Sequence, residues 1–249
     1  MAQQNLLYCL FIQTVESSLF THITVIAFDL DDTLWPCMPT IQRAEKATYQ
    51  WLQQNYPRIT EKYSEQALFE FRKAFMQRDE RYQIDLSLMR RELLAALATE
   101  FDYDASRLSQ QGFELFHHLR HDVSFYDDVF PLLDQLKHRY RLGSISNGNA
   151  NAGLTALKDY FDGYINAADI MVRKPGREIF HAFCDRLNTS PEQCLYVGDD
   201  PEFDVVGASD AGMQTVWLNR HQQNWPQQLP PAQMEVSNLR ELTELLIKD

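Results

Sequence analysis

The segment Phe28–Trp35 contains two carboxylates that are placed to act together on a phosphate ester. Asp29 and Asp31 lie two positions apart, at the end of the β-rich run from Ile23 to Leu30. A chain that leaves a strand into a turn can direct both at one substrate. One carboxylate can attack phosphorus, and the second can protonate the leaving oxygen and later deprotonate a water. The structural alternative is a capped turn, since Asp is common in turns.

Two later segments supply a phosphate-binding turn and a cation. Ser146, Asn147 and Gly148 offer a hydroxyl and a run of backbone N–H groups, which suit phosphoryl oxygens. Lys174 comes just before a predicted helix, where its ammonium can neutralise the attacked phosphate and the attacking carboxylate together. Each also has an ordinary structural explanation, because Ser-Asn-Gly is a common turn and most lysines are solvated.

The fourth segment, Gly198–Asp204, is rich in acidic residues and follows another β-rich run. Asp199, Asp200 and Asp204 are the candidates within it. Hard carboxylate oxygens beside a phosphate favour Mg²⁺, which accepts few protein ligands and keeps waters that the substrate can replace. The structural alternative for Asp200 or Asp204 is the N-cap of the next helix.

The elements that must position these groups are short strands alternating with helices. Strands are predicted at 23–30, 142–146, 194–197 and 214–218, and helices at 152–158, 176–187 and 203–211. This alternation predicts an α/β fold with right-handed crossovers and a doubly wound parallel sheet. Because ligands bind beyond the carboxyl ends of such strands, we expect the polar residues to converge on one edge.

Between Pro39 and about Ser124 the pattern becomes helical. Apolar residues recur at helical spacing, as in Ile41, Ala44 and Trp51. We predict a helical lid over 39–123, inserted after the first strand, and a catalytic core formed by 21–38 and 124–249. Residues 1–20 are an extension of unknown role, and Ser237 is expected to cap a last helix that ends near residue 248.

Composition narrows the class of protein. The chain has 249 residues, with 35 acidic against 23 basic residues and a net charge of −12, which disfavours a nucleic-acid partner. The cysteines show no CxxC pair, so free thiols are expected. Arg43 is the first Lys or Arg of the sequence, so no positive charge precedes the apolar N-terminal run and a signal peptide is not expected. No run is apolar enough to suggest a membrane span. We therefore expect a cytoplasmic protein with no membrane partner.

Some other polar residues have weaker functional explanations. His117 and His121 have the i, i+4 spacing of a metal pair, but a solvated helix face explains them equally well. Arginines of the insert, among them Arg72 and Arg90, could meet an anionic leaving group, but most of them are expected to be surface charge. Trp35 follows the first motif closely enough to line the mouth of a pocket.

Four ordered motifs resemble those of the haloacid dehalogenase (HAD) superfamily, in its phosphatase branch with a C1-type helical cap. They are Asp29-Leu30-Asp31-Asp32-Thr33, Ser146-Asn147, Lys174-Pro175, and Gly198-Asp199 with Asp204, and the match spans roughly Ile23 to Asn219. The resemblance implies a HAD-like Rossmannoid core. It implies Asp29 as the nucleophile, Asp31 as the general acid/base, Ser146 as a phosphate ligand and Lys174 as the charge anchor.

The same resemblance implies a cofactor and a reaction class. Mg²⁺ would be held by Asp29, the Asp31 backbone carbonyl and Asp199, with Asp200 or Asp204 in support, while Thr33 braces the loop. Ser146, Asn147 and Lys174 would bind the substrate. Dehalogenase members lack the second acid of the first motif, and this chain has Asp31. Phosphoryl transfer is therefore the expected chemistry.

The expected function is hydrolysis of a small phosphorylated metabolite. The motifs look similar to those of bacterial members that dephosphorylate flavin mononucleotide or the riboflavin precursor ribitylaminouracil phosphate. Two alternatives stay open: a phosphomutase, which would keep both aspartates, and a non-catalytic module that binds a phosphorylated metabolite. A monomer and a homodimer are both compatible with the sequence.

Overall fold

A computed structural model describes residues 20–247 of the chain. The expected extension over 1–20 lies outside the described residues, apart from Phe20. No helix within the described part is long and apolar enough to cross a membrane. Cys37, Cys184 and Cys194, the cysteines that the structure describes, are free thiols.

The centre of the molecule is a six-stranded parallel sheet with the strand order β3-β2-β1-β4-β5-β6. This confirms the predicted α/β fold class. The strands are β1 (Val25–Phe28), β2 (Arg141–Ser146), β3 (Gly163–Asn166), β4 (Cys194–Gly198), β5 (Gln214–Leu218) and β6 (Glu235–Val236). The central strand β1 lies between β2 and β4, so the three main polar motifs follow neighbouring strands.

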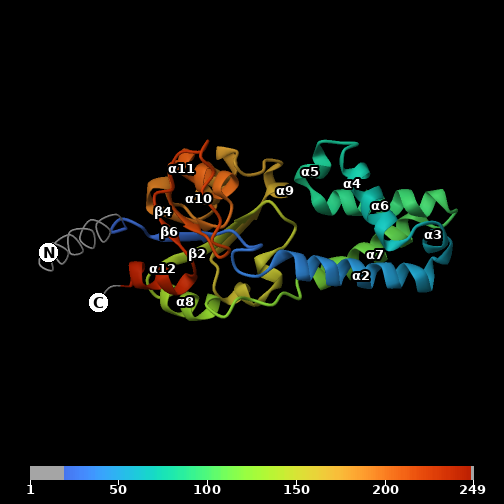
Figure 1. The fold of residues 1–249 in the computed structure, drawn as a ribbon, viewed down its shortest axis with the longest axis horizontal. Coiled ribbons are helices and arrows are strands. Elements are labelled where there is room, and N and C mark those ends of the chain that lie inside the picture. Colours follow the sequence, from blue (N-terminus) through green and yellow to red (C-terminus); the bar gives the residue numbers. More distant parts are fainter. Residues whose placement is uncertain (1–19, 248–249) are drawn as a thin grey trace, which may run out of the picture.

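Helices cover both faces of this sheet (Figure 1). Outside the insert, the helices that the structure describes are α8 (Val129–Leu136), α9 (Ala167–Ile170), α10 (Arg177–Arg186), α11 (Gly207–Asp210) and α12 (Leu239–Leu246). Short helical turns complete this part: η1 (Ala152–Leu154), η2 (Ala156–Asp159), η3 (Pro191–Gln193) and the π-helical η4 (Pro201–Val206).

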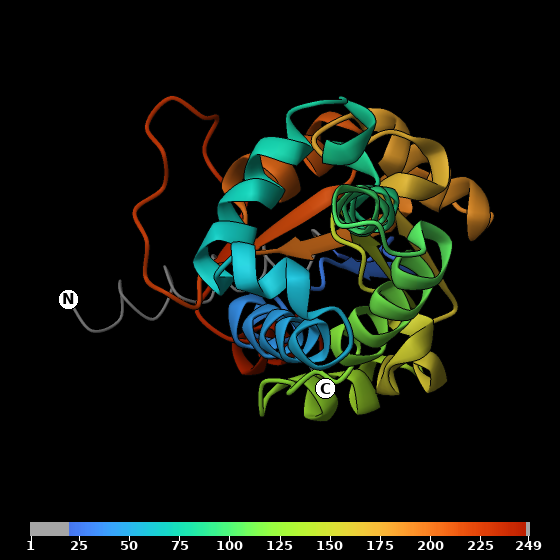
Figure 2. The same cartoon turned by 90° about the vertical axis from the view of Figure 1, so that its right-hand side faces the viewer.

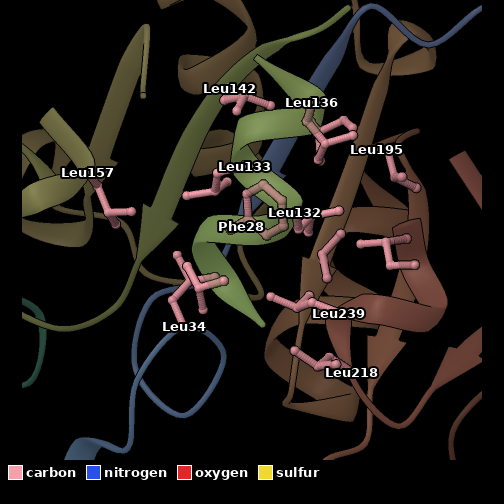
Figure 3. Packing of buried hydrophobic residues seen from close by; sticks show 14 of the residues in the cluster. Phe28, Leu34, Leu132, Leu133, Leu136, Leu142, Leu157, Leu195, Leu218 and Leu239 are labelled. Carbon is pink, nitrogen blue, oxygen red and sulfur yellow. The ribbon is translucent and has the colours of Figure 1, made fainter. Parts of the chain in front are cut away.

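Strand β1 is apolar on both sides because each side meets a different layer of helices. Ile26 and Phe28 belong to the cluster that includes α8 and α12, whereas Val25 and Ala27 belong to the cluster that includes α10. Figure 3 shows Phe28 among leucines of the first cluster. Burying a side chain of this size is worth about 2 to 3 kcal/mol. Asp29 is thus attached to a strand that is fixed from above and below.

Between β1 and β2 the chain forms six helices with an apolar cluster of their own. They are α2 (Cys37–Asn55), α3 (Pro57–Lys62), α4 (Glu65–Met76), α5 (Arg81–Ile84), α6 (Leu86–Glu100) and α7 (Ala105–Arg120). They extend from one end of the sheet, and Figure 2 shows them from that end, in front of the strands. Given this separate core, we propose the division into a cap over 39–123 and a core over 21–38 and 124–249.

Several predicted elements differ in detail from the structure. The helix predicted at 152–158 is two short 3₁₀ turns, and the one at 203–211 is divided into η4 and α11. The last helix is capped by Asn238, not by Ser237, because the Asn238 side chain accepts from the N–H groups of Arg240 and Glu241. Strands β3 and β6 were not predicted, since four and two residues are too few to show a period.

Candidate active site

Asp29 continues the line of β1 by one residue at the carboxyl edge of the sheet. Its backbone N–H donates to the Val197 carbonyl at 2.9 Å, so the β1–β4 hydrogen bonding holds its position. Its side chain is almost buried, at 7 % exposure of the residue. Burial raises the pKa of Asp29 well above its ordinary value, and the ammonium of Lys174 opposes that rise.

Lys174 lies at the centre of a buried polar cluster. Its Nζ donates to Asp29 Oδ1 at 2.6 Å, to Asp204 Oδ1 at 2.5 Å and to the Tyr196 hydroxyl at 2.9 Å. Burial alone would lower the pKa of Lys174, but Asp204 and Asp29 raise it above its ordinary value. The lysine is therefore a fixed positive charge against the Asp29 carboxylate.

Asn147 holds the backbone of Lys174 in place. Its Nδ2 donates to the Lys174 carbonyl at 3.0 Å, and its Oδ1 accepts from the Lys174 N–H at 2.7 Å. Ser146, at the end of β2, is buried and accepts from the Gly148 N–H at 3.0 Å. Both polar atoms of the Asn147 side chain thus brace Lys174, and its direct contact with substrate stays a prediction.

Three carboxylates meet beside Asp29. One oxygen from each of Asp29, Asp199 and Asp204 lies within 4.8 Å of the others. Burial and the charge of Asp204 raise the pKa of Asp199 to about 7. The site fits a hard divalent cation, because the candidate ligand atoms are carboxylate oxygens and the single charge of Lys174 neutralises only part of their negative charge.

The two supporting acids have different roles. Asp200 caps the next turn, because its Oδ1 accepts from the N–H groups of Glu202 at 2.9 Å and Phe203 at 2.7 Å. Asp204 turns back to the cluster, where its Oδ2 accepts from the Asp200 N–H at 3.0 Å. A Cβ at Gly198 would lie 2.4 Å from the Asp204 Cγ, so only glycine leaves room for this arrangement.

Asp31 points away from the three-carboxylate cluster. The loop reverses at Asp32, which has a φ of 61° and donates its N–H to the Trp35 carbonyl at 2.7 Å. Asp31 Oδ1 accepts from the Trp35 indole at 2.9 Å, and Oδ2 accepts from Arg120 Nη2 at 2.5 Å. The carboxylate of Asp31 is thus not part of the three-carboxylate cluster. The expected use of its backbone carbonyl as a metal ligand stays a prediction.

Residues around this loop differ from what the sequence suggested. Trp35 is fully buried instead of lining a pocket mouth, because its ring packs into the core while its indole N–H reaches Asp31. Thr33 does brace the loop, since its hydroxyl donates to Asp199 Oδ1 at 3.1 Å. Arg120 and Tyr196 were not foreseen as members of the site.

His121, the residue after α7, has backbone partners on its ring. His121 Nδ1 lies 2.6 Å from the His117 carbonyl oxygen, and its Nε2 accepts from the Asn151 N–H at 2.9 Å. Both ring nitrogens of His121 are therefore used, which removes the support for a metal pair with His117. Burial lowers the pKa of His121 to about 4, so the ring is neutral at physiological pH.

A cavity of about 560 Å³ lies within the insert, between α2, α4 and α6. Its walls include Met38 and Phe69, and it contains Arg72 and Arg90, which were expected at the surface. Glu45 accepts from both guanidinium groups, and the Arg90 distance is 2.6 Å. Burial lowers the pKa of Arg90 to about 9. A larger open hollow of about 1010 Å³ lies along α6 and α7. None of the catalytic candidates lines either cavity.

The comparisons with known proteins agree with this geometry. The family described as haloacid dehalogenase-like hydrolase matches residues 23–212. The 5-amino-6-(5-phospho-D-ribitylamino)uracil phosphatase YigB of Escherichia coli is 30 % identical over 234 residues, which cover 90 % of this chain and 96 % of YigB. The pyrimidine 5'-nucleotidase YjjG of the same species is 35 % identical, over 47 % of this chain and 54 % of YjjG.

A solved structure extends the similarity to three dimensions. A 2-haloacid dehalogenase from Pseudomonas syringae superposes with a TM-score of 0.82 and 34 % identity, covering 90 % of this chain and 98 % of that one. Sequence family, relatives and fold thus point the same way. The chain belongs to the haloacid dehalogenase-like hydrolase family.

Proposed function

We propose that this phosphoric monoester hydrolase works through a phosphoryl-aspartate formed on Asp29. The observation that carries the proposal is the pairing of the Asp29 carboxylate with Lys174 Nζ at 2.6 Å inside the three-carboxylate cluster. A carboxylate that is buried, fixed and paired with a cation is a competent nucleophile toward a phosphate ester.

The proposed reaction has two in-line steps. Asp29 attacks phosphorus while Asp31 protonates the departing alkoxide, and Asp31 then deprotonates the water that cleaves the phosphoryl-aspartate. Lys174 neutralises charge at the attacking oxygen, and Ser146 with the N–H groups after β2 holds the phosphoryl oxygens. A bound Mg²⁺, held by Asp29, Asp199 and the Asp31 carbonyl with Asp204 in support, would neutralise phosphoryl charge.

For the substrate, we propose a phosphate ester with a pyrimidine-type leaving group, such as a riboflavin-pathway phosphate. The names of YigB and YjjG both refer to pyrimidines. The cavity within the insert suits such a ring, because Phe69 is exposed there and two guanidinium groups share the carboxylate of Glu45. Ring carbonyl oxygens can accept from the spare N–H donors of Arg72 and Arg90.

This cavity is adjacent to the catalytic loop through the start of α2. The Cys37 N–H donates to Asp32 Oδ1 at 2.8 Å, and the next residue, Met38, lines the cavity. A substrate whose phosphoryl group lies at Asp29 would then extend its leaving group into the insert. We also propose a cytoplasmic location, and either a monomer or a homodimer, on the grounds given from the sequence.

A phosphomutase, a dehalogenase and a binding module are the functions to test against. A mutase would return the phosphoryl group to substrate and not to water, and a dehalogenase would release halide from a 2-haloacid. A binding module would tolerate the loss of Asp29. The presence of Asp31 beside the nucleophile favours hydrolysis of phosphate esters, since an alkoxide leaving group needs a proton.

The deciding experiment measures inorganic phosphate release with Mg²⁺ and with EDTA. The panel contains ribitylaminouracil phosphate, flavin mononucleotide, pyrimidine nucleoside monophosphates, sugar phosphates and p-nitrophenyl phosphate. We expect release from the wild type with Mg²⁺ alone, and none from a folded Asp29→Asn variant. Release that persists in this variant would remove Asp29 from the nucleophile role, and a folded wild type that releases none would refute the phosphatase proposal.

A further inference from the structure

We propose that Arg120 is a positioning residue that, together with Trp35, holds the general acid/base Asp31 and links it to the helical insert. This inference rests on the proposed function, because it assigns Asp31 its role in proton transfer. It adds a group from outside the four motifs, at the point where the insert rejoins the core.

The two partners of Asp31 come from opposite ends of the insert. Trp35 lies two residues before α2, and its indole N–H donates to Asp31 Oδ1 at 2.9 Å. Arg120 is the last residue of α7, and its Nη2 donates to Asp31 Oδ2 at 2.5 Å. Each carboxylate oxygen therefore has a donor from one of the two connections between insert and core.

The surroundings of Arg120 indicate that packing stability is not its purpose. Arg120 is 1 % exposed, and its Nε and Nη1 have no hydrogen-bond partner within residues 20–247. A buried guanidinium whose other nitrogens are unsatisfied is a net cost to folding. Its one ion pair in the described part of the chain, with Asp31, is the interaction that accounts for a cation at this position.

The loop after β2 closes the remaining side of Asp31. A Cβ at Gly148 would lie 2.8 Å from Asp31 Oδ2 and 3.5 Å from Arg120 Nη2. The next residue of the insert, His121, accepts from the Asn151 N–H at 2.9 Å in the same loop. The end of α7 is thus attached to both polar loops, so a rotation of the insert must displace the donors of Asp31.

The consequence concerns the step that needs a proton. An alkyl phosphate has a poor leaving group that depends on an acid in the correct place, whereas nitrophenolate departs without one. An acid misplaced by about 1 Å can cost about 100-fold in rate. Loss of Arg120 should therefore slow the first step for alkyl esters and spare it for p-nitrophenyl phosphate.

The test compares kcat/KM for these two esters, because kcat/KM reports the step that expels the leaving group. In Arg120→Met we expect a fall of about 10- to 100-fold for the preferred alkyl phosphate and less than about 3-fold for p-nitrophenyl phosphate. Arg120→Lys should recover part of the loss, since a cation remains. Arg107→Met, an exposed arginine of the same helix, is the matched control and should change neither value.

Thermal unfolding separates positioning from a merely structural role. We expect Arg120→Met to change Tm little, because the Asp31 carboxylate that loses its partner is partly exposed and keeps the Trp35 donor. An equal fall for both esters, no fall for either, or a faster alkyl ester would overturn the proposal. If Arg120→Met does not fold, Trp35→Phe decides, because it removes the other donor of Asp31 and leaves the phosphate-binding turn intact, so it should give the same ester-selective loss. A wild type active on both esters keeps the proposed function whatever these variants show.

Discussion

The three-carboxylate cluster makes the stability of the metal-free enzyme depend on pH in an unusual direction. Burial and Asp204 raise the pKa of Asp199 from 3.8 to about 7 in the folded chain. Between these pH values the folded state therefore binds more protons than the unfolded state. The contribution of Asp199 to the free energy of unfolding is fully present below about pH 4 and is lost as the pH rises toward 7. Most acids that are paired in folded proteins act in the opposite sense.

The size of the effect follows from the pKa difference. Each pKa unit is worth about 1.4 kcal/mol, so a rise from 3.8 to about 7 amounts to about 4 kcal/mol, which partial exposure of Asp199 reduces toward about 2. Mg²⁺ takes the place of the proton, so saturating metal should restore this stability at pH 7.5. At 100 times its Kd a ligand adds about 2.7 kcal/mol, which is of similar size.

Urea unfolding at pH 5 and at pH 7.5, with EDTA and with Mg²⁺, measures both effects. With EDTA, we expect the free energy of unfolding to fall between pH 5 and pH 7.5 by about 2 to 4 kcal/mol more in the wild type than in Asp199→Asn. We expect Mg²⁺ to remove this extra fall. The Asp199→Asn variant supplies the reference because it cannot ionise at this position. Equal pH dependence in both proteins would refute the raised pKa of Asp199, and no stabilisation by Mg²⁺ at pH 7.5 would refute the cluster as a metal site.

Three further outcomes are expected. Lys174→Met leaves Asp29 and Asp204 buried without their cation, so the free energy of unfolding at pH 7.5, measured by urea titration, should fall by about 3 to 5 kcal/mol. Phosphate release should also be lost, and retained release would contradict the proposed role of Lys174. Gly198→Ala places a Cβ 2.4 Å from the Asp204 Cγ, so the thermal shift caused by Mg²⁺ should shrink, and an unchanged shift would show that the cluster tolerates crowding. Phe69→Ala, in the insert cavity, should raise KM about 10-fold for the preferred ester but not for p-nitrophenyl phosphate, and equal KM changes would place the leaving group elsewhere.

Residues that act through a local motif at a strand end were predictable from the sequence. Asp29, Ser146 and Asp199 each follow an apolar run, and the parallel sheet brings those runs side by side. Their convergence required only the order of short elements. The separation of Asp200 from Asp204 required the structure, because both positions are compatible with a helix cap until the turn η4 is seen.

Contacts between distant helices were not predictable in this way. Arg120 meets Asp31 across 89 residues of sequence, and an arginine at the end of a helix looks like ordinary surface charge. Arg90 was expected at the surface for the same reason, yet its Cζ lies 3.3 Å from the centroid of the Phe116 ring and it pairs with Glu45. The short strands β3 and β6 could not be predicted, because they form by pairing with β2 and β5 and show no local sequence pattern of their own.

The separate apolar cluster of the insert has a consequence for how this enzyme can change. The described buried residues of that cluster and those of the two sheet clusters share no member, although Ile84 of α5 packs against the sheet cluster that includes α10. Most core positions of the insert can therefore accept substitutions independently of the sheet. Selection for a new leaving group can therefore rebuild the helices from α2 to α7 while the strand ends that perform the chemistry stay as they are. The positions that would have to vary together are those where the two parts meet, among them Trp35, Arg120 and Ile84.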